Sequence, residues 1–135
     1  VDKFIIGKVR YLKKGNKIAI LSYGITVSMA FELSERFSEI GKEVSVICVH
    51  TLKPLDKKGI SKIIEDYEKV IIIEEHVPHG GLSSRVKEIA VDIDGKAKIL
   101  SYTLQDKFIH FYGNHKELLS KHGLDLEKIF SEVNG

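Results

Sequence analysis

Hydrophobic and polar residues alternate along this chain in blocks whose lengths are typical of strands followed by helices. Short apolar runs predict strands at 17–21, 43–49, 69–73 and 98–102, after an extended segment at 4–12. Between these runs, apolar residues recur every three or four positions, which is the spacing of a helix with one buried face. This spacing predicts helices at 24–40, 54–67, 82–90, 115–121 and 125–133.

The alternation of strands and helices determines the fold class that we expect. Short connections between unlike elements favour a mostly parallel sheet with helices on both faces and right-handed crossovers. The 135 residues are enough for one hydrophobic core, so we expect a single domain spanning residues 1–135. The prediction is an α/β fold, a three-layer αβα sandwich with about five strands, mostly parallel and one antiparallel.

Composition and charge exclude several classes of partner. The 21 basic and 19 acidic residues give a formal net charge of +2, and the lysines are scattered between acids, so no nucleic-acid surface is expected. No apolar stretch is long enough to span a membrane, and no signal peptide is visible. Cys48 stands alone, which excludes an intramolecular disulfide and favours a buried, inert thiol in a cytoplasmic protein. The sequence begins at Val1, which is compatible with a segment of a longer chain.

The stretch 70–82 concentrates the residue types that carry chemistry. An apolar run ends there in acids, a histidine and a proline, followed by glycines and a helical pattern. Such strand-to-helix junctions lie at the carboxyl edge of open α/β sheets, where ligands and partners bind. The candidate residues of this junction are Glu74, Glu75, His76, His79, Gly80 and Gly81.

A second junction of the same kind follows the first apolar strand. Its candidate residues are Ser22, Tyr23, Gly24 and Thr26. If the first and third apolar strands are neighbours, both junctions line one crevice, and the helix N-termini near Thr26 and Leu82 point toward it. The negative charges of Glu74 and Glu75 disfavour the binding of an anion in this crevice. We therefore expect at most millimolar binding of phosphate or a small carboxylate, without catalysis.

Three interpretations of the acids and histidines remain open. Metal binding is disfavoured, because side chains leave a strand in alternating directions and cannot readily converge. A general acid–base pair is a second interpretation. In the third, the acids cap helices and the histidines lie at a contact with another domain. The sequence contains neither a GxGxxG nor a GxxxxGK[ST] nucleotide motif, and Ser83 and Ser84 lack the GxSxG context of a nucleophile.

Several segments resemble the C-terminal domain of transketolases. These are HTLKPLD at 50–56, EEH at 74–76 and GGLSS at 80–84, with IGKVR at 6–10 similar to the start of that domain and 106–125 similar to its end. The resemblance covers nearly the whole chain and is closest to the split kind, whose C-terminal section is a separate polypeptide. The end of the chain also resembles 1-deoxyxylulose-5-phosphate synthase, and its beginning resembles the beta subunits of 2-oxoacid dehydrogenases.

The resemblance implies part of an enzyme that moves a two-carbon ketol unit between sugar phosphates, in the pentose phosphate pathway. In that family, thiamine diphosphate and magnesium are held by the N-terminal and middle domains, on the same or a separate chain. The GDG…N metal motif and the activating glutamate of those domains are missing from this sequence. No catalytic, cofactor-binding or metal-binding residue is therefore carried over, and this domain alone is expected to bind no cofactor and to be inactive.

The implied role is support of the active homodimer by packing against the cofactor-binding domains. The loop at 74–82 and the segment 52–56 are expected to lie at or near contacts with partner domains. Replacing His76 by alanine should then weaken association more than it changes the melting temperature. The alternatives are the corresponding domain of 1-deoxyxylulose-5-phosphate synthase or of a 2-oxoacid dehydrogenase beta subunit, or a regulatory module that binds a small anion.

Overall fold

A computed structural model describes residues 8–50, 55–75, 81–104 and 126–134 of the chain. The strands are β1 (Arg10–Lys13), β2 (Ile18–Ser22), β3 (Ser45–Cys48), β4 (Lys69–Glu75) and β5 (Lys98–Leu104). The helices are the 3-10 helix η1 (Gly24–Thr26) and the α-helices α1 (Val27–Glu39), α2 (Lys57–Asp66), α3 (Leu82–Asp92) and α5 (Leu126–Asn134).

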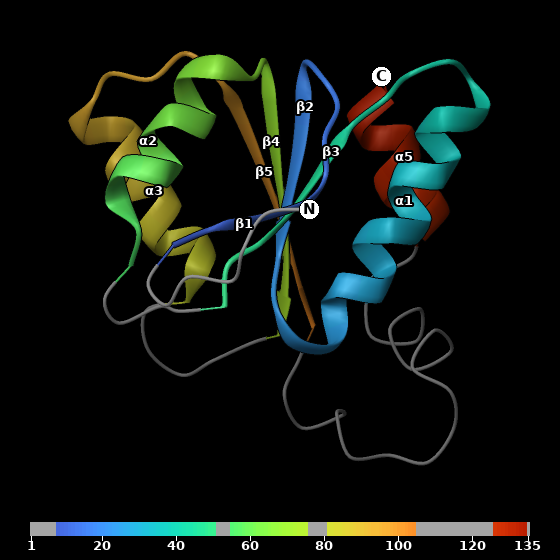
Figure 1. The fold of residues 1–135 in the computed structure, drawn as a ribbon, viewed down its shortest axis with the longest axis horizontal. Helices are drawn as coiled ribbons and strands as arrows, with labels where there is room; N and C mark the ends of the chain where they lie inside the picture. The colour runs from blue at the N-terminus through green and yellow to red at the C-terminus, as the bar shows by residue number, and fades with distance from the viewer. Residues whose placement is uncertain (1–7, 51–54, 76–80, 105–125, 135) are drawn as a thin grey trace.

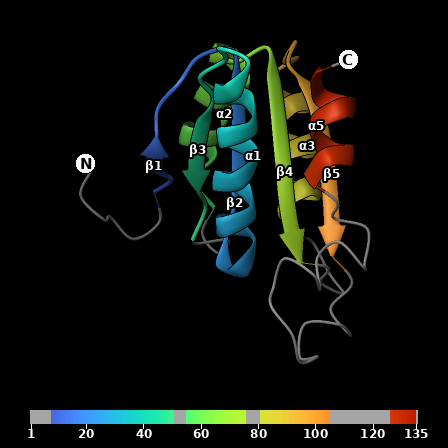
Figure 2. The ribbon, with the colours of Figure 1, turned by 90° about the vertical axis from the view of Figure 1, so that its right-hand side faces the viewer.

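The five strands form one sheet in the order β1-β3-β2-β4-β5 (Figure 2). β2, β3, β4 and β5 are parallel, whereas β1 pairs antiparallel with β3 at the edge of the sheet. Helices α1 and α5 cover one face, and α2 and α3 cover the other (Figure 1). The prediction of a three-layer αβα sandwich with one antiparallel strand is confirmed.

The sheet separates two hydrophobic clusters because successive residues of a strand point to opposite faces. Ile18 and Ile20 of β2 pack toward α1 and α5, and Ala19 and Leu21 pack toward α2 and α3. All five residues of β2 are buried, so both faces of this central strand are covered. The continuous apolar runs of the sequence reflect this two-sided burial.

Most predicted elements are present, with shifted ends. The sequence places the end of β4 at Ile73, but the structure continues the strand to Glu75, because both acids pair in register with β5. Ile40, the last residue of the helix predicted at 24–40, lies just beyond the end of α1 at Glu39 and is 47% exposed. The helix predicted at 115–121 and the chain before Lys8 lie outside the described residues.

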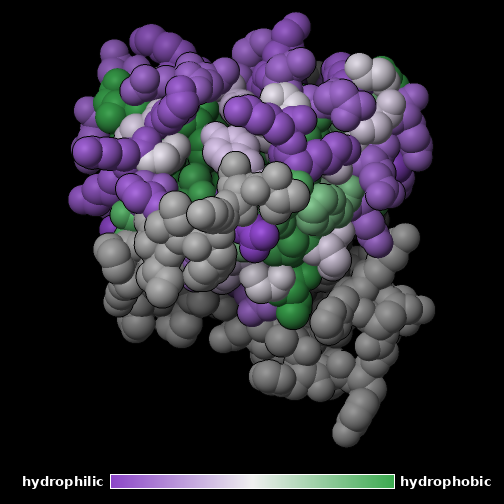
Figure 3. Space-filling view, in the orientation of Figure 1, coloured by the Kyte–Doolittle hydropathy of each residue, from purple (hydrophilic) through white to green (hydrophobic). Residues whose placement is uncertain are grey.

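On the face of the molecule seen in Figure 3, the outer parts of the helix layers are mostly hydrophilic, and apolar residues are gathered between the layers. None of the helices in the described part of the chain combines the length and the apolar character needed to cross a membrane.

Candidate functional site

The carboxyl ends of β2 and β4 lie side by side in the middle of the sheet. Ser22 pairs in register with Ile73, so the junction after β2 lies next to Glu74 and Glu75, as expected for neighbouring strands. The chain leaves β2 toward one face through α1 and leaves β4 toward the other face through α3. This divergence is the switch point at which doubly wound sheets bind ligands. We call the residues there the β2–β4 edge: Ser22, Tyr23, Gly24, Thr26, Glu74 and Glu75.

Thr26 links the turn after β2 to the end of β4 through hydrogen bonds of its hydroxyl group. Its Oγ1 lies 2.8 Å from the carbonyl oxygen of Tyr23 and 2.8 Å from that of Ile73. A hydroxyl carries one hydrogen, so the two carbonyl oxygens share it. Gly24 makes this turn possible because its φ of 63° lies in the left-handed region that other residues rarely adopt.

Glu74 caps helix α3. Its side chain points away from solvent, with the residue 3% exposed, and its Oε2 accepts hydrogen bonds from the backbone N of Ser83 at 2.6 Å and from the Ser83 Oγ at 2.7 Å. The N-cap residue Gly81 has no side chain to supply this cap. The structure thus confirms that an acid of this junction caps a helix, and the carboxylate occupies the N-terminus of α3, where the sequence predicted at most weak anion binding.

Glu75 is held differently from its neighbour. It is half-buried, and among the described residues its carboxylate makes neither a hydrogen bond nor an ion pair. Its Oε1 lies over the turn after β2, 4.0 Å from the position that a Cβ on Gly24 would take. This carboxylate is therefore available to a group from outside the described chain.

Two hydroxyl groups at the β2–β4 edge are buried and have no hydrogen-bond partner among the described residues. They are the Oγ of Ser22, whose residue is fully buried, and the phenol oxygen of Tyr23. Burial, together with the negative charges of Glu74 and Glu75, raises the pKa of Tyr23 to about 12. The phenol therefore stays protonated, and it lies in a region of negative potential.

The other sequence-predicted residues divide into two groups. Gly81 is the N-cap of α3, while His76, His79 and Gly80 lie outside the described residues. Of the segment 52–56, Leu55 and Asp56 are described. Leu55 is buried in the core, and Asp56 caps α2, because its Oδ1 accepts a hydrogen bond from the backbone N of Gly59 at 3.0 Å. The Oδ2 of Asp56 accepts a further bond from the backbone N of Val9 at 3.0 Å.

Metal binding and thiol chemistry are the remaining kinds of activity to consider. Within the described ranges, no three or more His, Cys, Asp or Glu residues are grouped so that they could hold a metal ion. The sequence predicted a buried thiol at Cys48, but the structure shows this residue half-buried. Burial raises the pKa of its thiol, and the nearby Arg10 guanidinium opposes that rise. The thiol is consequently mostly protonated at neutral pH and a weak nucleophile.

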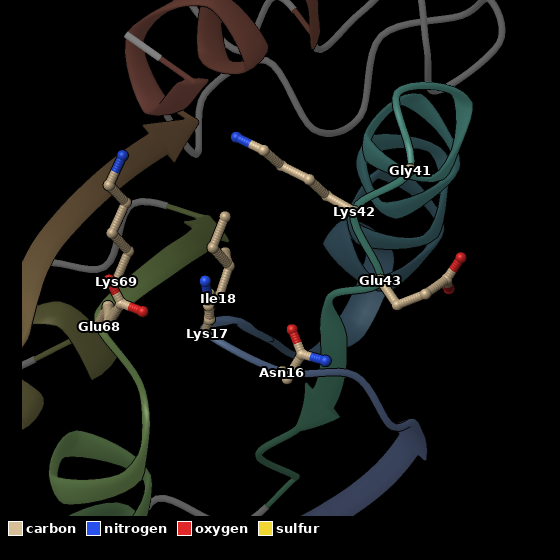
Figure 4. Close-up of a pocket in the computed structure, with 8 residues that line it drawn as sticks. All are labelled: Asn16, Lys17, Ile18, Gly41, Lys42, Glu43, Glu68 and Lys69. Atoms are coloured by element: carbon tan, nitrogen blue, oxygen red, sulfur yellow. The ribbon is translucent and has the colours of Figure 1, made fainter.

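A pocket of about 420 Å³ lies at the opposite, amino edge of the sheet (Figure 4). Sequence reasoning missed it because its lysines are scattered along the chain, on Lys17, Lys42 and Lys69. Two of them hold the C-terminal end of α5: Lys42 Nζ donates to the Oδ1 of Asn134 at 2.8 Å, and Lys69 Nζ donates to the carbonyl oxygen of Val133. These cations complement the partial negative charge at a helix C-terminus, so their arrangement has a structural explanation.

The sequence of this chain matches one protein family and several proteins of known name. A family model described as "Transketolase, C-terminal domain" matches residues 7–129. The 1-deoxy-D-xylulose-5-phosphate synthase of Francisella tularensis subsp. mediasiatica is 34% identical over 131 residues, which cover 96% of this chain and 20% of that protein. The enzyme of the same name from subsp. novicida is 33% identical over the same length and coverage.

A solved structure is similar over almost all of the chain. It is described as a split gene transketolase, an inactive beta4 tetramer, and superposes with a TM-score of 0.80 at 25% sequence identity. The match covers 98% of this chain and 43% of that one. The chain thus spans about a fifth of the length of the curated relatives and less than half of the solved neighbour.

Proposed function

Because the chain belongs to the transketolase C-terminal domain family, we propose that it is the C-terminal domain or subunit of a thiamine-diphosphate-dependent transketolase. The complete enzyme transfers a two-carbon ketol unit between sugar phosphates. Thiamine diphosphate and magnesium are held by N-terminal and middle domains, on the same or a separate chain, and the full assembly is a homodimer. We call those domains the catalytic section.

The observation that carries the proposal is the family match across residues 7–129, which includes both strand-to-helix junctions. The neighbour described as part of a split gene transketolase supports a section that works with other polypeptides. The chemistry of the β2–β4 edge is compatible with this role. Glu74 is committed to the α3 cap, whereas the half-buried carboxylate of Glu75 has neither a hydrogen bond nor an ion pair with the residues that the structure describes.

A second candidate is the C-terminal domain of a 1-deoxyxylulose-5-phosphate synthase. Identities of 33% and 34% to enzymes of that name, over 96% of this chain, favour it. Both candidates assign the same supporting role to this domain. An assay of the chain combined with its catalytic section separates them, because one candidate predicts ketol transfer between sugar phosphates and the other predicts formation of 1-deoxy-D-xylulose 5-phosphate.

Calorimetry on the isolated chain tests the supporting role. Titration with thiamine diphosphate in the presence of magnesium should give no saturable heat, because the proposal assigns the cofactor to the catalytic section. A micromolar dissociation constant for the cofactor would contradict the proposal. Titration with phosphate, followed by NMR chemical shifts, should show at most millimolar binding near the β2–β4 edge, whereas tight binding there would favour a regulatory module.

A further inference from the structure

The pocket of about 420 Å³ at the amino edge of the sheet collects positive charge from three separate segments of the chain. We call it the amino-edge pocket, and its cationic residues are Lys17, Lys42 and Lys69. We propose that it binds a small phosphate monoester, whose anionic group lies between these ammonium groups. The site goes beyond the proposed function, because it lies at the end of the strands opposite the β2–β4 edge.

The first support is the convergence of two ammonium groups. The side chains of Lys42 and Lys69 extend toward α5 from opposite sides of the pocket (Figure 4). Lys42 Nζ donates to the Oδ1 of Asn134, and Lys69 Nζ donates to the carbonyl oxygen of Val133, so consecutive residues of one helix hold both groups in place. An ammonium has three N–H donors, and each of these bonds uses one of them. Donors of both lysines therefore remain for a ligand.

The second support is the charge balance of the pocket, which favours an anion. The carboxylate of Glu43 points away from the pocket (Figure 4), accepts a hydrogen bond from the hydroxyl of Ser38 and lies 3.8 Å from the ammonium of Lys13. The exposed carboxylate of Glu68 lines the pocket and offsets one of its three lysines. The positive charge that remains matches a phosphate monoester, which carries a charge of about −1.5 to −2 at neutral pH.

The third support is the backbone of Lys17, which has an unusual conformation for a lysine. Its φ of 64° lies in the left-handed region, and the backbone N of Ile18 donates to the carbonyl oxygen of Asn16 at 2.7 Å, which closes a tight turn. The carbonyl oxygen of Lys17 accepts hydrogen bonds from the backbone N of Glu68 at 2.7 Å and of Lys69 at 3.1 Å. These bonds explain the turn but not the side chain, because glycine or asparagine adopts this conformation with less strain. A lysine at this strained position supports a role for its charge in the pocket.

The size and lining of the pocket suit a ligand larger than a bare anion. Its volume of about 420 Å³ falls within the range of about 300–1,000 Å³ that is typical of sites for small organic molecules. Ile18 and Gly41 also line it and offer apolar contact to carbon atoms. A Cβ on Gly41 would meet no described heavy atom within 4 Å beyond its chain neighbours, so the space beside this backbone is open. A phosphate group attached to a short carbon chain therefore uses more of the pocket than phosphate alone.

Titration of the chain with glycerol phosphate, inorganic phosphate and glycerol, followed by amide chemical shifts, tests the inference. Glycerol phosphate should bind with a dissociation constant below about 1 mM and more tightly than inorganic phosphate, whereas glycerol should not bind. The shifts should be concentrated at 16–18, 41–43 and 68–69. Lys17→Gln should weaken binding roughly fivefold, because one ammonium is lost while the bonds of Lys42 and Lys69 to α5 remain. The matched control Lys58→Gln, whose side chain is exposed on α2, should bind like the wild type.

The location and the selectivity of binding decide the outcome. Chemical shifts confined to the β2–β4 edge, or no saturable shifts, would overturn the inference. Equal affinities for glycerol phosphate and inorganic phosphate would overturn it as well, because the carbon chain would then make no contact. Unchanged binding by Lys17→Gln, or equal weakening by Lys58→Gln, would show that net charge rather than this pocket governs binding, and would also overturn the inference.

Discussion

Ser83 and Glu74, nine residues apart in the sequence, are joined by two hydrogen bonds to one carboxylate oxygen. The backbone N and the Oγ of Ser83 donate to Oε2 of Glu74 at 2.6 and 2.7 Å. The link connects the end of the central strand β4 to the first turn of α3 across a segment that the structure does not describe. It therefore fixes the β2–β4 edge relative to the helix layer behind it.

Replacing Ser83 by alanine should lower the free energy of unfolding by about 1–2 kcal/mol, because the Oγ–H bond to a buried carboxylate is lost. Ser84→Ala is the matched control, since that neighbouring side chain is exposed. Chemical denaturation measures both. Equal stabilities of the two variants would show that the Oγ contributes nothing to the cap.

Replacing Thr26 by valine should also cost about 1–2 kcal/mol, because the shape is kept while the hydroxyl that bonds the carbonyls of Tyr23 and Ile73 is removed. Thr26→Ser keeps the hydroxyl and should retain more of the stability. Urea unfolding of the two variants gives the comparison. A serine variant less stable than the valine variant would point to packing of the methyl group instead.

Lys69→Met should loosen the C-terminal turn of α5, because the ammonium that donates to Val133 and complements the helix dipole is lost. An effect of about 1 kcal/mol corresponds to roughly fivefold faster amide hydrogen exchange in that turn. Lys62→Met, which removes an exposed ion pair with Asp66 on α2, is the control. Unchanged exchange in α5 of the Lys69 variant would contradict the structural role of this lysine.

Tyr23 should make the protein less stable at high pH. Its folded-state pKa of about 12 lies above the ordinary value of 10.0, so the protonated phenol is favoured by folding. Its contribution is fully present below about pH 10 and is lost as the pH rises through the folded-state pKa. Melting temperatures measured across that range should fall less steeply for Tyr23→Phe than for the wild type. Parallel curves would contradict the raised pKa.

Cys48 should react slowly with a thiol reagent at pH 7, because burial raises the pKa of its thiol and covers part of it. The same chain in denaturant supplies the reference rate. A native rate equal to the denatured rate would show that the thiol is exposed and ordinary.

The fold could be predicted because the core strands are buried on both faces and therefore appear as apolar runs. The runs at β2 and β4 predicted two strands, and the structure places these strands side by side in the middle of the sheet. The ends of strands were less predictable, since pairing between β4 and β5 carries Glu74 and Glu75 into the ladder although both are charged. Hydrophobicity does not encode that pairing.

The sequence predicted where the two strand-to-helix junctions lie, but not the different roles of the side chains within them. Adjacent acids in a sequence look equivalent, yet strand alternation sends Glu74 toward α3 and Glu75 toward the face covered by α1. The role of Ser83 also requires the third dimension, because the distance from Glu74 depends on how the chain returns to the start of α3. The lysines of the amino-edge pocket converge from separate segments, which a single sequence does not show.

The central claim is that this chain supports an enzyme whose cofactor-binding machinery lies in other domains. Reconstitution tests it most directly: the catalytic section encoded in the same genome is assayed with thiamine diphosphate and magnesium while this chain is added in increasing amounts. The account predicts that neither component alone turns over substrate and that ketol transfer, or formation of 1-deoxy-D-xylulose 5-phosphate, rises and saturates at equimolar chain. Full activity of the catalytic section without this chain, or turnover by this chain alone, would contradict the account.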